Sequence, residues 1–179
     1  MSNAQQWEGW NVENAIEDQA AASKGTVDYW KPSEGDNVIR VLPARPGMGS
    51  PLVVSYNHYI EFPTGKVSFN CPKMLTKAPC PACARYDQLM KAGGPANEKA
   101  ADNYKAKVRV YANIVVRTAE ETGVQVYAFG KMVLDALVEI RKDQQAGGDF
   151  TDPEDGFDLV LKKKTQNGQP RYTVMGSRN

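Results

Sequence analysis

The sequence of 179 residues contains one histidine, three cysteines and no long apolar run. A membrane-spanning helix requires ~18 consecutive apolar residues. The polar N-terminus has no basic stretch followed by an apolar one, so we expect neither a membrane span nor a secretion signal. A glycine-rich loop that would cradle phosphates and a clustered pair of acids are also missing. These absences, together with the use of the only histidine described next, argue against an enzyme.

The histidine and the three cysteines lie in one short window, as His58, Cys71, Cys80 and Cys83. Their spacing closes with a Cys-Pro-Ala-Cys knuckle whose two thiolates can face one tetrahedral ion. Three buried thiols beside a hydrogen-bonded histidine are one alternative. A redox dithiol is another, but it leaves His58 and Cys71 without a role. Three sulfurs and one nitrogen are typical of a closed site, so we predict one structural Zn²⁺ bound by these four residues in a reducing compartment.

The net charge of +1 hides a strong asymmetry along the chain. Residues 1–36 carry −5 (two basic, seven acidic), residues 37–117 carry +8 (twelve and four), and residues 118–179 carry −2 (eight and ten). Segregated charge favours an anionic partner for the middle of the chain, although a solvated basic face gives the same pattern.

Residues 1–36 are polar and acidic, with too few apolar residues for a core of their own. The segment Ala15–Ala22 fits a short helix, and Trp7 and Trp10 are suited to anchor the segment onto the fold or onto a neighbour. We therefore predict an acidic N-terminal arm over residues 1–36. The core is expected over residues 37–179, with a zinc-binding insertion at about 58–92.

The remaining sequence alternates strand signals with two helix signals. Helices are expected over Ala82–Met90, which ends before a Gly-Gly-Pro stop, and over Lys131–Gln144, which has a broad apolar stripe. Strands are expected over Asn37–Leu42, Leu52–Ile60, Lys66–Asn70, Lys105–Arg117, Gly123–Gly130, Gly156–Lys164 and Pro170–Met175. This order predicts a mainly β fold, an OB-fold five-stranded barrel with a zinc-binding subdomain and a few helices.

The strand Lys105–Arg117 shows the clearest alternation of apolar and polar residues. Its even positions from Ala106 to Val116 are small or β-branched and predict a core face. Its odd positions predict a basic face that carries one aromatic ring. In Gly123–Gly130 we expect Val124, Val126 and Ala128 to point inward, which leaves Gln125, Tyr127 and Phe129 on the other side.

Several stretches resemble one family, the zinc-containing single-stranded DNA-binding (helix-destabilising) proteins of tailed bacteriophages. They are the spacing of the four zinc ligands, YANIVV at Tyr111–Val116, YAFGKMVLDAL at Tyr127–Leu137 and DGFDLVLKKK at Asp155–Lys164. The resemblance covers roughly residues 37–175. It implies an OB fold, a zinc-stabilised subdomain, and a basic cleft between the two. It also implies cooperative, sequence-indifferent binding of ssDNA in phage replication, recombination and repair, in the cytoplasm of the infected bacterial host.

Binding of this kind needs cations that follow the phosphates and flat side chains on which any base can stack. Tyr127 and Phe129 fit barrel packing equally well, and Lys162–Lys164 fit a solvated edge. The predicted ssDNA contacts are Lys105, Lys107, Arg109, Tyr111, Tyr127 and Phe129, extended by Arg40, Lys162, Lys164 and Arg171. The alternative is a zinc-bearing RNA-binding or protein-interaction module, because nothing in the sequence identifies a reader of the 2′-OH.

The chain departs from the family pattern at both ends. Its arm is acidic where the family's tends to be basic, and the terminal Gly176–Asn179 contains no acid. We expect the native chain to continue past Asn179 into an acidic tail that competes with ssDNA, an effect that salt would screen. The expected partners are ssDNA, neighbouring copies along the strand, and replication and recombination proteins recruited through that tail, with no membrane.

Overall fold

The computed structural model describes residues 28–143 and 148–177. The predicted helix Ala15–Ala22 and both Trp7 and Trp10 lie outside these residues. Within them the elements are β1 (Gly35–Val41), β2 (Leu52–Phe62), β3 (Gly65–Asn70), α2 (Pro72–Leu75), α3 (Pro81–Ala92), α4 (Pro95–Asp102), β4 (Lys107–Val116), a 3₁₀ turn η1 (Glu120–Thr122), β5 (Gln125–Phe129), α5 (Lys131–Lys142), β6 (Asp158–Gln166) and β7 (Gln169–Ser177). No helix among the described residues is long and apolar enough to cross a membrane.

The seven strands form one antiparallel sheet, which confirms the prediction of a mainly β fold. Its hydrogen-bonded order is β3-β2-β4-β1-β6-β7, and β5 pairs with the opposite edge of β4. In the described residues no strand pairing joins β5 to β7, so the hydrogen bonds define an open sheet. The order of strands and helices along the chain otherwise follows the sequence prediction, with boundaries that differ by a few residues.

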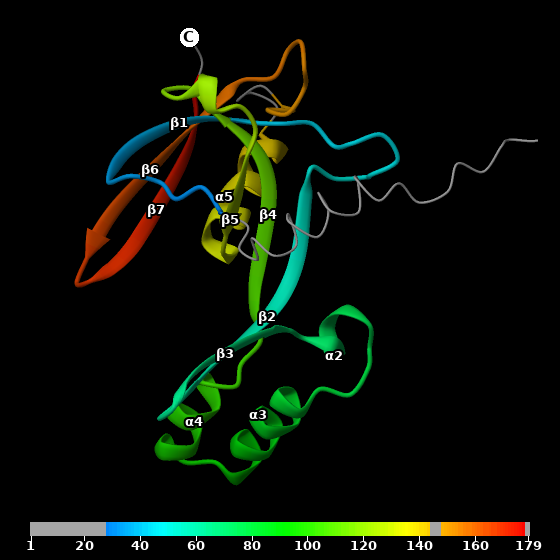
Figure 1. Ribbon diagram of the computed structural model, residues 1–179, viewed down its shortest axis with the longest axis vertical. Helices are drawn as coiled ribbons and strands as arrows, with labels where there is room; N and C mark the ends of the chain where they lie inside the picture. The colour runs from blue at the N-terminus through cyan, green and yellow to red at the C-terminus, as the bar shows by residue number, and fades with distance from the viewer. Residues whose placement is uncertain (1–27, 144–147, 178–179) are drawn as a thin grey trace, which may run out of the picture.

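The strand β2 belongs to two lobes (Figure 1). Its first half, Leu52–Asn57, pairs with β4, and its second half, Asn57–Phe62, pairs with β3. The small lobe consists of the β2–β3 hairpin with α2, α3 and α4, and the large lobe of the remaining strands with α5. Two helices of the small lobe, α2 and α4, were not predicted. Each has proline in its first turn, Pro72 and Pro95, a position that proline favours.

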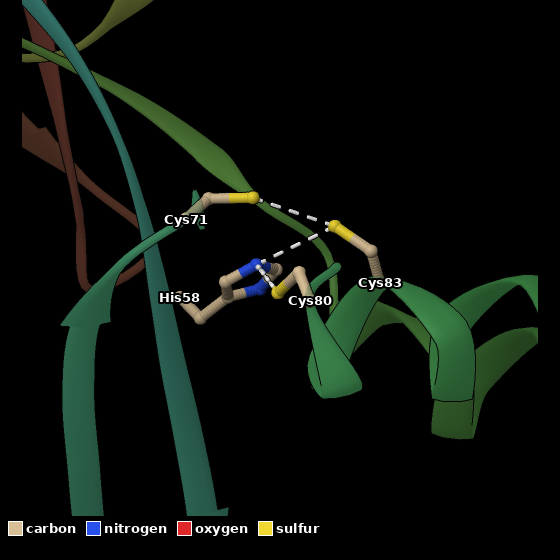
Figure 2. Close-up of side chains that lie close together, drawn as sticks. All are labelled: His58, Cys71, Cys80 and Cys83. Atoms are coloured by element: carbon tan, nitrogen blue, oxygen red, sulfur yellow. Dashed lines mark hydrogen bonds between the residues drawn. The ribbon is translucent and has the colours of Figure 1, made fainter. Parts of the chain in front are cut away.

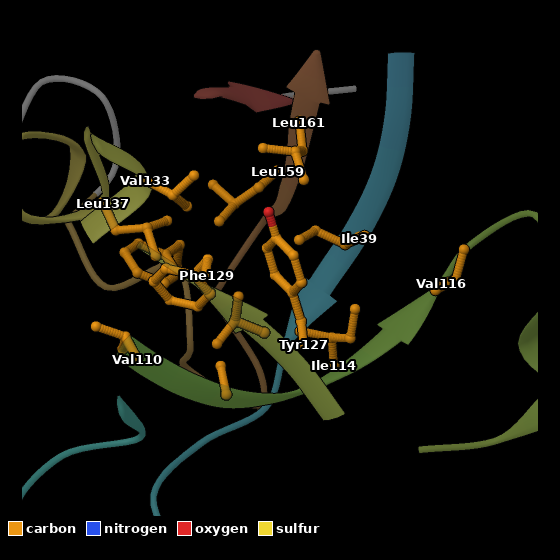
Figure 3. Packing of buried hydrophobic residues seen from close by; sticks show 13 residues of the cluster. Ile39, Val110, Ile114, Val116, Tyr127, Phe129, Val133, Leu137, Leu159 and Leu161 are labelled. Carbon is orange, nitrogen blue, oxygen red and sulfur yellow. The ribbon is translucent and has the colours of Figure 1, made fainter. Parts of the chain in front are cut away.

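The core of the large lobe is built on the predicted face of β4. Val110, Ala112, Ile114 and Val116 are buried at alternate positions, as the sequence predicts. Figure 3 shows side chains from β1, β5, β6 and α5 that pack against them. These include Ile39, Tyr127, Phe129, Val133, Leu137, Leu159 and Leu161.

The prediction for the faces of β5 is wrong for Val124 and for both aromatic rings, whereas Ala128 is buried as predicted. Tyr127 and Phe129 are 4% and 3% exposed, whereas Val124 is 60% exposed. The register explains the reversal, because Phe129 lies opposite Val110 and Tyr127 lies opposite Ala112. Residues directly opposite each other in an antiparallel pair share a face, so both rings point into the core.

Residues 28–34, which the sequence assigned to the arm, pack onto the large lobe. The backbone N–H of Trp30 donates to the carbonyl of Val126 at 2.9 Å, and the indole meets the Tyr127 ring edge-on at 5.0 Å. Pro32 is buried, and its carbonyl accepts a hydrogen bond from Lys163 at 3.2 Å. This segment therefore lies between β5 and β6, along the side of the sheet that strand pairing leaves open.

The inward face of β5 predicts the effect of two substitutions on stability. Phe129→Ala should lower the free energy of unfolding by about 3–5 kcal/mol, because it leaves a cavity in the core. Val124→Ala, which truncates an exposed side chain just before β5, should change it by less than about 0.5 kcal/mol. Chemical denaturation measures both values. Equal losses would contradict the observed register.

Candidate functional site

The four predicted metal ligands meet in the small lobe (Figure 2). His58 Nε2 lies 3.4 Å from the sulfur of Cys80 and 3.6 Å from that of Cys83, and the sulfurs of Cys71 and Cys83 are 3.4 Å apart. All four ligand atoms lie within 4.8 Å of one another. Ligands bound to one tetrahedral ion at 2.0–2.3 Å are separated by roughly 3.3–3.8 Å. The cluster is therefore suited to hold one metal ion.

The orientation of His58 is set by its other ring nitrogen. Nδ1 lies 2.8 Å from the backbone carbonyl of Tyr104, in the turn before β4. A carbonyl only accepts, so Nδ1 carries the proton and Nε2 presents its lone pair to the sulfurs. A metal-binding histidine usually has such a second partner, which fixes its tautomer. The ring is completely buried and packs against Phe69, which lies opposite it on β3.

Two of the cysteines lie directly before helices. Cys71 precedes α2 and Cys80 precedes α3, each followed by proline at the first helical position. Burial acts to raise the pKa of Cys80, but the backbone N–H groups of Cys83 and Ala82 bring that pKa below its usual value. Burial and the neighbouring Cys71 and Cys80 raise the pKa of Cys83 to about 12. Three sulfurs this close are stable as thiolates only beside a cation.

The metal ligands also form much of the core of the small lobe. Its buried apolar cluster consists of Ile60, Cys71, Cys80 and Ala82, and two of these are ligands. Several other apolar side chains of the lobe, including Val67, Met74 and Leu75, are exposed. Outside this cluster Leu89 and Ala101 are also buried, so the apolar burial that could hold the lobe without the ion is small.

The second part of the site is the outer face of β4. Lys107, Arg109 and Tyr111 alternate with the buried core residues, and Lys105 is exposed just before the strand. The register places Asn57, Ser55 and Val53 of β2 opposite Lys107, Arg109 and Tyr111, so these side chains share one surface. We call this surface the β2–β4 face. Within residues 28–143 and 148–177, the side chains of Lys105, Lys107 and Arg109 make no hydrogen bond or ion pair. Lys66 chiefly lowers the pKa of the Glu61 carboxyl, and Lys107 is near enough to that carboxyl to help lower it.

Two aromatic side chains of this surface were missed from the sequence. The ring of Tyr29 lies 5.6 Å from that of Tyr111, but Tyr29 falls in the segment assigned to the arm. Tyr59 is exposed on β2. It follows His58, so its outward direction could have been inferred from the inward direction of a metal ligand. Burial, followed by the nearby Tyr29 and Tyr59, raises the pKa of Tyr111.

A lysine was also missed at the junction of the lobes. Lys131, the first residue of α5, lines a cleft of about 550 Å³ together with Asp102, Lys105 and Lys107. Its Nζ lies 2.7 Å from the carboxylate of Asp135, so Lys105 and Lys107 are the lysines of this cleft that form no ion pair among the described residues.

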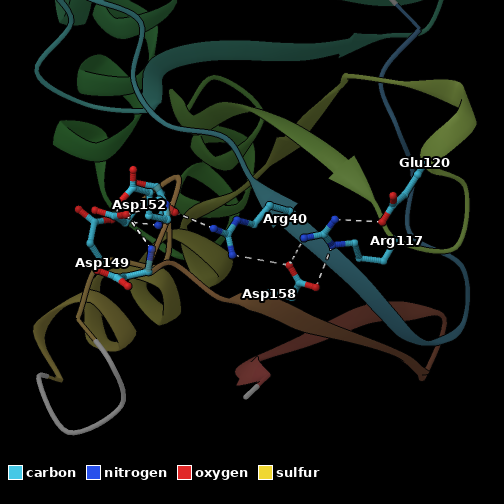
Figure 4. A network of polar contacts seen from close by, with 9 residues as sticks. Arg40, Arg117, Glu120, Asp149, Asp152 and Asp158 are labelled. Atoms are coloured by element: carbon cyan, nitrogen blue, oxygen red, sulfur yellow. Dashed lines mark hydrogen bonds and ion pairs between the residues drawn. The ribbon is translucent and has the colours of Figure 1, made fainter. Parts of the chain in front are cut away.

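Four predicted contact residues are not available for binding on this surface. Two are buried in the core, and two are paired with other groups of the protein. Tyr127 and Phe129 are core residues, as shown above, which corrects their assignment as stacking rings. Arg40 donates to the carbonyl of Asp152 at 2.6 Å and lies 3.8 Å from Asp158 (Figure 4). Lys162 lies 3.1 Å from Asp36. Because both cations already have acidic or carbonyl partners, they are poorly placed to bind phosphate.

The last two predicted residues form a like-charged pair at the β6–β7 hairpin. Lys164 and Arg171 are exposed and lie directly opposite each other. Like charges in this arrangement are destabilising unless an anion lies between them. The structure therefore leaves this pair accessible but separate from the cluster around Lys107 and Arg109.

The fold and the site together define a mainly β protein with a cluster suited to hold one metal ion and a face of cations that form no ion pairs among the described residues. Residues 33–179 match the family described as gp32 DNA binding protein like. The match spans most of the chain, so the protein belongs to this family of phage single-stranded DNA-binding proteins. A comparison with curated proteins finds no match.

The metal cluster predicts that the small lobe depends on its ion. Cys80→Ser or a strong chelator should release one equivalent of metal and make residues 58–92 sensitive to protease, while the large lobe stays folded. Limited proteolysis with mass spectrometry and metal analysis measure both effects. Lys77→Ser, on the exposed loop between α2 and α3, is a matched control and should keep the ion. An unchanged protease map in the metal-free protein would refute the prediction.

The pairing of Arg40 predicts a structural role for it. Arg40→Ala should lower the free energy of unfolding by about 1–3 kcal/mol, because it removes a charged, part-buried hydrogen bond to the Asp152 carbonyl. Arg141→Ala, which removes the exposed pair with Asp149, should cost less than about 1 kcal/mol. Thermal unfolding distinguishes the two. A stable Arg40→Ala variant with impaired nucleic-acid binding would restore Arg40 to the binding surface.

Proposed function

We propose that the protein binds single-stranded DNA without sequence preference, and that the β2–β4 face is its binding surface. The observation that carries this proposal is the set of cations on that face whose side chains form no ion pair among the described residues. Arg40, Arg117 and Lys162 are paired with carboxylates, whereas Lys105, Lys107 and Arg109 are not. Unpaired cations in a row supply the electrostatic part of binding to a phosphate backbone.

Stacking of bases on aromatic rings would supply the part of the binding free energy that is not electrostatic. The rings of Tyr29 and Tyr111 lie together beside Arg109, and Tyr59 follows on the same surface. Every base has a face on which an aromatic ring can stack, so such contacts tolerate any sequence and are worth about 1–3 kcal/mol for each base. Together the rings and the cations fit a flexible single strand better than a duplex, whose bases are already stacked.

We propose that the metal is zinc and that its role is structural. The donor set of one imidazole and three thiolates favours zinc over the cations that prefer oxygen. Four protein ligands complete a tetrahedral shell, which leaves no position for a substrate or water. The ion would hold the small lobe against β2 and thereby complete the cleft that Lys105, Lys107 and Lys131 line.

We also propose that the large lobe is an OB-type barrel. Two observations support this: β4 pairs with β2 and β1 along one edge and with β5 along the other, and the segment Tyr29–Pro32 covers the open side between β5 and β6. In this proposal the arm extends to about residue 36, the core runs from 37 to 179, and the zinc-binding insertion covers about 58–92. OB folds bind single strands across such outer faces.

In the cell, the proposed role is to protect single-stranded DNA and to remove its secondary structure. This role would serve phage replication, recombination and repair in the cytoplasm of the infected host. Neighbouring copies along the strand, and replication and recombination proteins, are the partners we propose. An RNA-binding role is the competing outcome, and equal affinity for oligo-dT and for matched RNA would favour it.

The proposal predicts different effects for a cation and a ring on the β2–β4 face. Arg109→Ala should weaken oligo-dT binding and reduce the slope of log affinity against log salt by about 0.7, because one phosphate contact is lost. Tyr111→Ala should weaken binding by roughly tenfold while that slope stays nearly unchanged. Fluorescence titration at several salt concentrations measures both.

Matched controls come from α3 on the small lobe. Arg85→Ala and Tyr86→Ala remove the same side-chain types outside the β2–β4 face and should bind oligo-dT like the parent. If the two test variants also bind like the parent, the outer face of β4 is not the DNA surface.

A further inference from the structure

A pocket lies beside the β2–β4 face, between the loop of residues 43–51 and β4. Its volume is about 240 Å³. Sites for drug-sized molecules start at about 300 Å³, so this one suits a smaller flat group. The loop joins β1 to β2 and runs along the same side of the large lobe as β4 (Figure 1).

The floor of the pocket is mostly apolar and contains one amide. Val53 lies opposite Tyr111, and Val126 lies opposite Asn113, so these four side chains share the outer face of the sheet. Pro43, Met48 and Pro51 supply the wall, and Arg45 lies at the same rim. The floor thus offers an aromatic ring and apolar surface for stacking, next to a single polar group.

The amide of Asn113 is free to bind a ligand. No hydrogen bond of its side chain is formed with any of the described residues, and the residue is only half-buried. The backbone carbonyl of Asn113, in contrast, already has a partner, because it accepts a hydrogen bond from the N–H of Leu42 at 2.9 Å. That bond fixes the start of the loop to β4, and a turn between Arg45 and Met48 shapes the wall. The pocket is therefore formed without a ligand.

We propose that this pocket binds one unstacked nucleobase through its Watson–Crick edge. The inference rests on the proposed binding of single-stranded DNA. An asparagine amide presents one donor and one acceptor side by side. Each of the four bases offers a neighbouring acceptor and donor on that edge, so Asn113 can pair with any of them. The edge is occupied in a duplex, so the pocket selects unpaired strands without reading sequence.

The neighbouring side chains fit the same ligand. Tyr111 would stack on the bound base, and the Arg45 guanidinium would meet the phosphate of the same nucleotide. Affinity and discrimination would therefore come from different residues of one surface. The cations on β4 provide affinity for any polyanion, and Asn113 provides the distinction between single-stranded and paired DNA.

The test uses oligo-dT and an oligomer of the same length made of N3-methylthymidine. The methyl group removes the Watson–Crick donor but leaves the phosphates and the ring face unchanged. The parent protein should bind the methylated oligomer about threefold to tenfold more weakly, the range expected for one lost hydrogen bond. For Asn113→Ala the two oligomers should bind with a ratio close to one. Gln88→Ala, which removes an exposed amide on α3, should keep the parent's ratio.

Three outcomes separate the possibilities. A parent protein that binds both oligomers equally overturns the pocket but leaves the proposed function in place. A variant Asn113→Ala that keeps the parent's ratio overturns the role of Asn113. A parent protein that binds neither oligomer overturns the proposed function itself.

Discussion

The ring of His58 is held at both of its nitrogens, and the relation between the two lobes depends on this contact. Nδ1 donates to the carbonyl of Tyr104, just before β4, while Nε2 faces the sulfurs of Cys80 and Cys83 at the start of α3. One residue earlier, Asn57 pairs with both Lys107 and Asn70, so β2 changes partner from β4 to β3 beside the metal cluster. The contacts of His58 and the shared strand β2 therefore set the direction in which the small lobe leaves the sheet.

That geometry explains why the basic surface lies where it does. Lys105 and Lys107 follow Tyr104 directly, so the carbonyl that orients His58 also fixes the start of the row of unpaired cations. Several other cations of the large lobe are paired with acids. Asp158 alone contacts both Arg40 and Arg117 (Figure 4). A row of cations without ion pairs thus begins at the junction of the lobes, although the net charge of the protein is only +1.

The sequence predicts what depends on local pattern and misses what depends on strand register. The spacing of the histidine and the cysteines was sufficient to predict the four candidate metal ligands. The alternation of apolar and polar residues was sufficient to predict the two faces of β4. The faces of β5 were predicted in reverse, because only pairing with Val110 and Ala112 decides that Phe129 and Tyr127 point inward. Arg40 and Lys162 were predicted as phosphate contacts, because their acidic partners lie on other elements. The helices α2 and α4 could have been found from the prolines that begin them.

The location of the binding surface can be measured directly by lysine acetylation with and without oligo-dT. The account predicts that bound DNA protects Lys105 and Lys107, which lie at the junction of the lobes. Lys99 on α4 and Lys142 at the end of α5 should react equally in both samples, because they lie outside the β2–β4 face. Mass spectrometry gives the extent of modification at each position. Protection of Lys99 and Lys142 with continued reactivity of Lys105 and Lys107 would contradict the account.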